Sequence, residues 1–324
     1  MDVSTSRFQI YPEIQPHSSG MLDLDGHHKM YWEVSGNPEG VPVLFLHGGP
    51  GAGASSVHRR FFDPAYYRIV VFDQRGSGRS RPFGDITDNT TRHLVGDMEM
   101  LRQHLEIDRW LIFGGSWGSS LALAYGIAHP EKVYGYILRG IFLCRPKELD
   151  WFLHGVAQVF PEHHRRFVEF VPEDERGDGW GDVLMAYHRR LVDPDPAVHG
   201  PAARSWTRFE AACSTLLPNP QTVAGLESGR GALALARIEA HYFVNNMFLP
   251  DNFFLDNLHK VAESPATLVQ GRYDMVCPIT TADEVARAWP KAEYVIVPDA
   301  GHSAMEPAIR SALVAATERF KTLL

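Results

Sequence analysis

The stretch Gly114-Gly115-Ser116-Trp117-Gly118 decides the fold of this chain. An apolar run at residues 110–113 precedes it, and small residues with a helical pattern follow it as far as residue 128. Where a strand turns directly into a helix, the middle residue stands on a sharp turn, and glycines beside it avoid collisions because they lack a Cβ. The sequence therefore predicts that Ser116 stands exposed at the carboxyl edge of a sheet, near the positive N-terminus of a helix.

A strand, a G-x-S-x-G motif and a helix, in this order, form the nucleophile elbow of an α/β hydrolase. The rest of the chain agrees with this fold class. Residues 21–34 are expected to form a hairpin around Asp25-Gly26, and the apolar spacing between residues 93 and 107 predicts a helix. Continuous apolar runs typical of buried strands occur at 43–46, 69–72, 136–138, 267–269 and 294–297. Strands that alternate with helices predict a mostly parallel central sheet flanked by helices on both faces.

The pattern changes between residues 144 and 245. Buried strand runs disappear there, apolar residues follow helical spacing, and closely spaced prolines mark loops. We interpret residues 144–245 as a helical cap domain inserted into an α/β-hydrolase core that comprises residues 1–143 and 246–324. A last amphipathic helix is expected to carry on one face Ile309, Leu313, Ala316 and Phe320.

Composition excludes several classes of function. The chain has 324 residues and a net charge of −8, whereas nucleic-acid binding needs a basic footprint. No apolar stretch approaches the length of about 18 residues that suggests a membrane span. An odd number of widely spaced cysteines, Cys144, Cys213 and Cys277, does not indicate a disulfide framework. The first residues lack the basic and apolar regions of a signal peptide, so we expect a cytoplasmic protein without a secretory leader.

A serine hydroxyl is a weak nucleophile at neutral pH and needs a base. In this fold the partners follow in the order Ser, then Asp or Glu, then His. His302 follows the expected strand at 294–297, and Asp274 follows the one at 267–269. We predict that Ser116 attacks a carbonyl, that His302 transfers the proton, and that Asp274 orients the imidazole and stabilises its cation.

Two other aspartates compete with Asp274 for this role. Asp283 lies inside an expected helix, and Asp299 is so close to His302 in sequence that it fits better as a residue that shapes the loop.

The tetrahedral intermediate needs two hydrogen-bond donors for its oxyanion. One is expected to be the backbone amide of Trp117, the residue after the nucleophile. The other should come from His47-Gly48-Gly49-Pro50-Gly51, where we favour Gly49. This loop could also be a simple glycine turn, but it has neither of the glycine spacings that bind nucleotides.

The sequence gives no reason to expect a cofactor or a metal ion. No His or Cys pattern has the spacing of a zinc site. The histidine pairs His27-His28 and His163-His164 are expected to be solvated.

Distinctive motifs are spread over most of the chain. They are Tyr11-Pro12-Glu13-Ile14, His47-Gly48-Gly49-Pro50-Gly51, Asp73-Gln74-Arg75-Gly76-Ser77-Gly78-Arg79-Ser80, Gly114-Gly115-Ser116-Trp117-Gly118-Ser119, Leu138-Arg139-Gly140-Ile141-Phe142, Arg237-Ile238-Glu239-Ala240-His241-Tyr242-Phe243 and Gly271-Arg272-Tyr273-Asp274. Together they resemble the motifs of the proline iminopeptidases (prolyl aminopeptidases), serine exopeptidases with the α/β-hydrolase fold. The stretches in the cap region are more specific to this family than the elbow is.

The resemblance implies release of an N-terminal proline from small peptides, with cap carboxylates that bind the substrate's amino terminus. On this chain those carboxylates fall at Glu210 and Glu239. The role makes physical sense because a buried ammonium without an anion is costly. The alternative is that both glutamates lie on solvated helix faces.

The resemblance also points to an apolar pocket for the proline ring. Its expected members are Phe142, Phe243 and either Phe152 or Trp151. The chain departs from the family at Phe209, where the family usually has a second Trp, and near Leu153, where it often has a Tyr.

Two other functions remain open from the sequence. A cap-bearing esterase or amidase for small acyl substrates would use the same triad without requiring an amine. A ligand receptor on the same fold would not use the triad at all.

Overall fold

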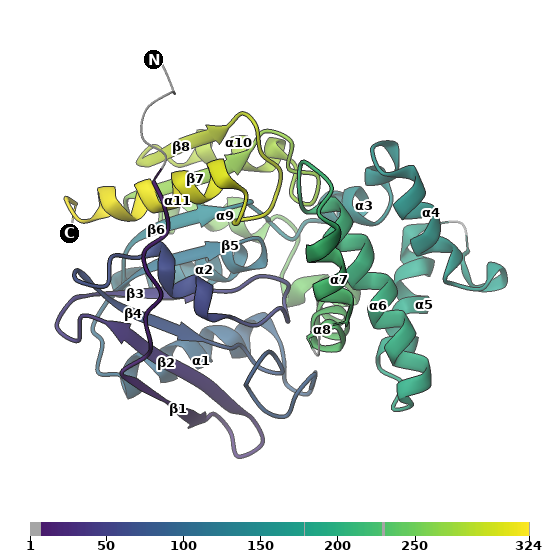
Figure 1. Cartoon of the computed structure of the whole chain (residues 1–324), viewed down its shortest axis with the longest axis horizontal. Helices are drawn as coiled ribbons and strands as arrows, with labels where there is room; N and C mark the ends of the chain where they lie inside the picture. Colours follow the sequence, from purple (N-terminus) through teal and green to yellow (C-terminus); the bar gives the residue numbers. More distant parts are fainter. Residues whose placement is uncertain (1–7, 178, 229–230, 324) are drawn as a thin grey trace.

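The computed structural model describes residues 8–177, 179–228 and 231–323. Within these residues, eight strands form one sheet in the order β1-β2-β4-β3-β5-β6-β7-β8 (Figure 1). The strands are β1 (Ser18–Asp23), β2 (Lys29–Gly36), β3 (Val41–Leu46), β4 (Tyr67–Phe72), β5 (Trp110–Gly115), β6 (Val133–Arg139), β7 (Ala266–Gly271) and β8 (Ala292–Val297).

The sheet is parallel except at one edge. β1 and β2 form the predicted hairpin, and β2 also pairs antiparallel with β4. From β4 to β8 every neighbouring pair is parallel. The carboxyl ends of β3, β5, β6 and β7 therefore meet at the same edge, and Leu46 of β3 lies opposite Gly114 of β5. This arrangement confirms the predicted fold class and brings the loops after the strands together.

Alternating side chains of the central strands fill two separate cores. In β3, Val43 and Phe45 belong to one core and Leu44 and Leu46 to the other, because successive side chains point to opposite faces. The core around Val43 is closed by α11 (Pro307–Phe320), the expected last helix. The opposite core is closed by α1 (Thr91–His104), α2 (Trp117–Ala128) and α10 (Ile279–Ala288).

Between β6 and β7 the described residues form helices and loops but no strand. All but the last of these helices gather beside one end of the sheet, on the right of Figure 1. They are α3 (Pro146–Leu153), α4 (Pro161–Glu169), α5 (Trp180–Leu191), α6 (Pro196–Cys213), α7 (Pro220–Ser228) and α8 (Ala232–Val244). The short α9 (Phe253–Asn257) follows and lies beside α2 of the sheet domain. The buried side chains of these helices continue the core that contains Leu44, so the helical segment is packed onto the sheet domain.

In the described part of the chain, we find no helix with the length and apolar character that crossing a membrane requires.

Candidate active site

Ser116 lies on the sharp turn between β5 and α2. Its backbone has φ of 58° and ψ of −130°, a conformation that non-glycine residues rarely adopt. Its N–H donates to the carbonyl oxygen of Arg139 at 2.8 Å, which ties the turn to the end of β6. A Cβ at Gly114 would collide with the carbonyl oxygen of Gly118, and one at Gly118 with that of Leu46. The two glycines therefore allow the backbone to approach closely enough for this turn.

Asp274 and His302 lie in contact at the carboxyl edge of the sheet. His302 Nδ1 lies 2.8 Å from Oδ2 of Asp274. The other carboxylate oxygen of Asp274 accepts the backbone N–H groups of Val276 at 3.1 Å and Cys277 at 2.8 Å. Gln270 donates its side-chain amide to Oδ2 at 3.2 Å. The aspartate is thereby fixed in position and orients the imidazole.

The two competing aspartates lie elsewhere. Asp283 is inside α10, and Asp299 is exposed in the loop before His302.

The second ring nitrogen of His302 contacts Arg139, the last residue of β6. Nη1 of Arg139 lies 3.0 Å from Nε2 of His302 and also donates to the His302 carbonyl oxygen at 2.9 Å. A guanidinium has only donors, so Nε2 must be the acceptor and Nδ1 must carry the proton. This is the tautomer in which a histidine can accept a proton at Nε2 while it donates to the aspartate.

The hydroxyl of Ser116 is not hydrogen-bonded to His302 in this structure. Among the described residues, the ring of His302 bonds to Asp274 and Arg139, whereas the Ser116 side chain bonds to the thiol of Cys277. Ser116, Arg139 and His302 nevertheless line one cavity. For His302 Nε2 to accept a proton from Ser116, the Arg139 contact would have to break.

Ser116 lines two cavities. The first has a volume of about 20 Å³, and among its lining residues are Gly49, Phe142, Phe152, Glu239, Phe243 and Cys277. The second has a volume of about 300 Å³, and among its lining residues are Gly48, His58, Arg139, Glu210, His302 and Ser303. The structure thus brings the three phenylalanines together in a small, mainly apolar space next to the serine.

Gly49 and Trp117, the two expected oxyanion donors, both lie close to Ser116. Gly49 has φ of +105°, which favours glycine, and it lines both cavities. Trp117 is the first residue of α2, where a backbone N–H has no partner within the helix. The Trp117 indole donates to Gln74 Oε1 at 2.9 Å, and the Gln74 amide donates to the His47 carbonyl oxygen at 2.9 Å. Gln74 thereby links the elbow to the glycine loop.

Glu210 of α6 and Glu239 of α8 form a buried pair of carboxyl groups. Their side chains are hydrogen-bonded to each other, and the Trp206 indole donates to Glu239 Oε2 at 2.5 Å. Burial raises the pKa of Glu210, and burial together with the neighbouring Glu210 raises the pKa of Glu239 well above its ordinary value. Two carboxylates in contact cannot both ionise cheaply without a cation. The pair is therefore suited to bind one.

Comparisons with known proteins show the family and the fold of this chain. A profile of the alpha/beta hydrolase fold matches residues 41–308. A proline iminopeptidase from Arabidopsis thaliana is 51% identical over 97% of this chain and 83% of its own length. Proline iminopeptidases from Xanthomonas citri and Neisseria gonorrhoeae are 49% and 46% identical, over 96% and 95% of this chain and 99% and 98% of their own lengths.

The chain belongs to the proline iminopeptidase family.

A solved esterase from Exiguobacterium antarcticum supports the fold alone. It is 18% identical to this family member, with a TM-score of 0.64 over 94% of this chain and 100% of its own length.

Two interpretations of individual residues in this family member were wrong. Glu239 is only 4% exposed, so it does not lie on a solvated helix face. His28 was expected to be solvated, but it is only 1% exposed because it packs at the end of the first hairpin against Arg75 and Asp25.

Sequence reasoning did not assign roles to Arg139, Gln74, Gln270 and Trp206. A signal existed for Arg139, because it is a charged residue at the carboxyl end of an otherwise apolar strand next to the elbow strand. The other three bond to predicted site residues through contacts that depend on packing, and no local pattern marks them.

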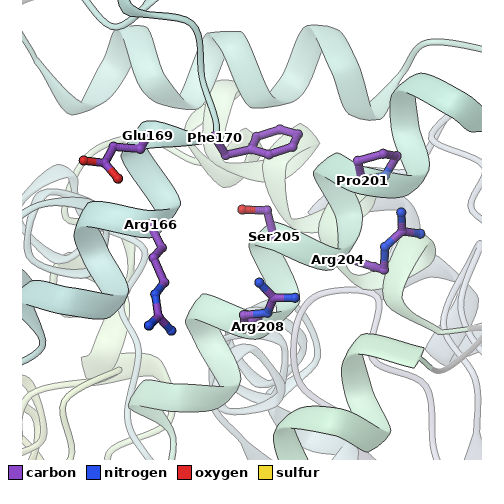
Figure 2. Close-up of a pocket in the computed structure, with 7 residues that line it drawn as sticks. All are labelled: Arg166, Glu169, Phe170, Pro201, Arg204, Ser205 and Arg208. Atoms are coloured by element: carbon purple, nitrogen blue, oxygen red, sulfur yellow. The ribbon is translucent and has the colours of Figure 1, made fainter.

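A further pocket of this family member lies away from Ser116, between α4 and α6. Figure 2 shows Arg204 and Arg208 on one helix and Arg166 on the other. All three arginines are exposed, and none of the predicted site residues lines this pocket.

Proposed function

We propose that this chain is a serine exopeptidase that releases N-terminal proline from small peptides. The observation that carries the proposal is the buried Glu210–Glu239 pair next to the Ser116 cavities. An N-terminal amine is cationic near neutral pH, and a pair of buried carboxyl groups offers it the counter-charge that a buried cation requires.

The proposed binding mode places the proline ring in the small cavity, whose lining side chains would have to move apart to admit it. Phe142, Phe152 and Phe243 would contact the ring, and the carboxyl pair would contact its nitrogen. Because Glu239 and Ser116 line this same cavity, the amine and the attacked carbonyl must belong to the same residue. The enzyme would therefore remove only the first residue of a peptide.

The proposed reaction is acyl transfer through a covalent intermediate. Ser116 Oγ attacks the proline carbonyl while His302 Nε2 accepts the hydroxyl proton, and Asp274 stabilises the resulting imidazolium. The backbone N–H groups of Gly49 and Trp117 would stabilise the oxyanion. His302 then gives its proton to the leaving amine, and water, activated in the same way, releases proline and restores Ser116.

We further propose that the helices within residues 144–245 act as a cap domain on a core formed by residues 1–143 and 246–324. Glu210 and Glu239 come from this segment, whereas Ser116, Asp274 and His302 come from the core. Catalysis and recognition of the amine would thus be divided between the two parts. The three cysteines are free and buried, which supports our proposal of a reducing, cytoplasmic location.

Matched substrates test the proposal against an esterase or amidase. The substrates are proline 2-naphthylamide, its N-acetylated form, and a nitrophenyl ester without an amine. Hydrolysis confined to the free-amine substrate supports the exopeptidase, and equal hydrolysis of the acetylated form would contradict it. The same panel with other N-terminal residues measures selectivity for proline. Ser116→Ala should be inactive, and failure of a fluorophosphonate to label Ser116 in the wild type would favour a receptor.

A further inference from the structure

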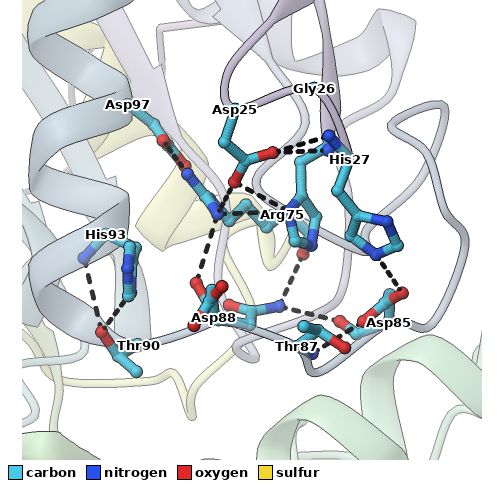
Figure 3. Close-up of polar contacts among 12 residues, drawn as sticks. Asp25, Gly26, His27, Arg75, Asp85, Thr87, Asp88, Thr90, His93 and Asp97 are labelled. Carbon is cyan, nitrogen blue, oxygen red and sulfur yellow. Dashed lines mark hydrogen bonds and ion pairs between the residues drawn. The ribbon is translucent and has the colours of Figure 1, made fainter.

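A second cluster of potential ligands lies at the hairpin between β1 and β2. Among the described residues, one group of at least three His, Cys, Asp or Glu side chains could hold a metal ion, and it consists of His27, His28 and Asp85. Each offers one ligand atom, and these atoms all lie within 4.8 Å of one another. Figure 3 shows the His27 ring pointing toward the carboxylate of Asp85. None of the three lines the cavities beside Ser116.

His28 is the fixed member of this cluster. Its side chain is only 1% exposed, and its Nε2 is buried without a hydrogen-bond partner among the described residues. A buried ring nitrogen without a partner destabilises a fold. A ligand that fills this position would remove that cost.

The other ring nitrogen of His28 determines which form the imidazole takes. Nδ1 lies 3.1 Å from Asp25 Oδ2 and 3.2 Å from Arg75 Nη1. The two hydrogens of that guanidinium nitrogen already have acceptors, Asp25 Oδ2 at 2.6 Å and the Asp88 carbonyl oxygen at 3.3 Å. Nδ1 of His28 therefore donates its proton to Asp25, which leaves the lone pair on Nε2.

A carboxylate that accepts from the far nitrogen of a ligating histidine is the usual outer partner in metal sites. Asp25 is suited to this role. Its carboxylate accepts the backbone N–H groups of His27 at 3.1 Å and His28 at 2.7 Å, and it pairs with Arg75 Nη1 at 2.6 Å. These contacts hold the Asp25 carboxylate in place behind His28.

We propose that His27, His28 and Asp85 bind a divalent transition-metal ion of the Zn²⁺ or Co²⁺ type. Two imidazoles and one carboxylate are a ligand set that suits these ions, with water in the fourth position. His27 Nε2 lies 2.9 Å from Asp85 Oδ2, close to the separation of about 3.3 Å that follows from tetrahedral bonds of 2.0–2.1 Å. The metal would replace the proton between these two atoms, and His27 would then carry its proton on Nδ1.

Closing the site requires movement only of the accessible ligands. The His27 side chain is 51% exposed and that of Asp85 18%, whereas His28 is fixed. The loop that carries Asp85 also supports α8. Arg237 of α8 donates to the Gly84 carbonyl oxygen at 3.4 Å, and Tyr242 donates to Asn89 Oδ1 at 3.1 Å. The ion would therefore join the β1–β2 hairpin to the loop that carries Asp85. This loop contacts α8, the helix that carries Glu239.

The test is a titration of the purified, chelator-treated full chain with Co²⁺, followed by visible absorption and by competition with Zn²⁺. We expect intense tetrahedral bands that saturate at one equivalent, and a rise in Tm. His27→Ala and Asp85→Asn should each weaken binding at least tenfold, and neither replaces a buried core side chain.

His163→Ala is the matched control, because His163 belongs to the other adjacent histidine pair and also has an acidic neighbour, Glu162. It should bind Co²⁺ like the wild type. Absence of saturable binding at millimolar Co²⁺ would overturn the proposal. So would binding that both His27→Ala and Asp85→Asn retain in full, since the ion would then occupy another site such as the histidines near Ser116.

Discussion

Nη1 of Arg139 lies 3.0 Å from Nε2 of His302, the nitrogen that must receive the serine proton in the proposed reaction. The same guanidinium holds the His302 carbonyl oxygen at 2.9 Å. Burial lowers the pKa of Arg139, while the nearby charge of Asp274 acts in the opposite direction. In the proposed reaction, Arg139 would keep the imidazole in the tautomer that can accept a proton at Nε2, and this contact would break when Ser116 reacts.

Arg139→Met should lower kcat/KM for proline 2-naphthylamide. Loss of hydrogen bonds from a charged group costs about 1.5–3 kcal/mol, so the decrease should be at least about tenfold. Arg109→Met is the control, because Arg109 makes a similar contact to the Val133 carbonyl oxygen at the opposite end of β6. Unchanged kcat/KM would show that Arg139 is not needed to position His302, and increased kcat/KM would show that it restrains the reaction.

Glu210→Gln and Glu239→Gln should each reduce kcat/KM for free-amine substrates by at least about 100-fold, because removing one partner of a buried ion pair costs about 3–5 kcal/mol. Hydrolysis of a nitrophenyl ester without an amine should be retained, since it does not use the pair. Glu169→Gln, an exposed position on α4, is the control. A parallel loss with both substrates would point to damage of the fold instead of loss of amine binding.

The Glu210–Glu239 pair should also make the ligand-free protein less stable as the pH rises. Above the ordinary carboxyl pKa the unfolded chain has lost these protons, but the folded chain retains them because burial raises both pKa values. The folded state then binds more protons, so the free energy of unfolding falls with increasing pH until the pair ionises.

Urea unfolding between about pH 5 and pH 8 measures this slope. A Glu210→Gln/Glu239→Gln double variant should show a flatter dependence and greater stability at the upper end. An identical slope in the double variant would show that the pair does not hold its protons in the folded state.

A bulky thiol reagent should inactivate the protein through Cys277. This thiol lines the small cavity with Ser116 and is only 4% exposed, and burial raises its pKa well above the ordinary value. Reaction should therefore be slow, and each attached group should block the cavity. Cys277→Ala should resist inactivation relative to its own starting activity, whereas Cys213→Ala, at another buried thiol, should remain sensitive. Full labelling of Cys277 with unchanged activity would contradict this expectation.

The fold could be predicted from the sequence because each pattern that indicates a strand, a helix or the elbow spans only a few neighbouring residues. Continuous apolar runs became β3 to β8, and the order of strands and helices then required a parallel sheet. The glycines around Ser116 indicated the elbow because only they permit its close backbone contacts. The expected positions of Asp274 and His302 followed from the same logic, since the ends of parallel strands share one edge.

What the sequence alone determined about this protein is thus the order of its elements and which loops carry chemical groups. Tertiary structure decided which groups touch. The Arg139–His302 contact joins residues 163 positions apart, and Trp206 reaches Glu239 across 33 positions. Pairing of Glu210 with Glu239 and burial of His28 likewise depend on how elements pack. Such contacts arise from distances and orientations between elements, which no local spacing of residues encodes.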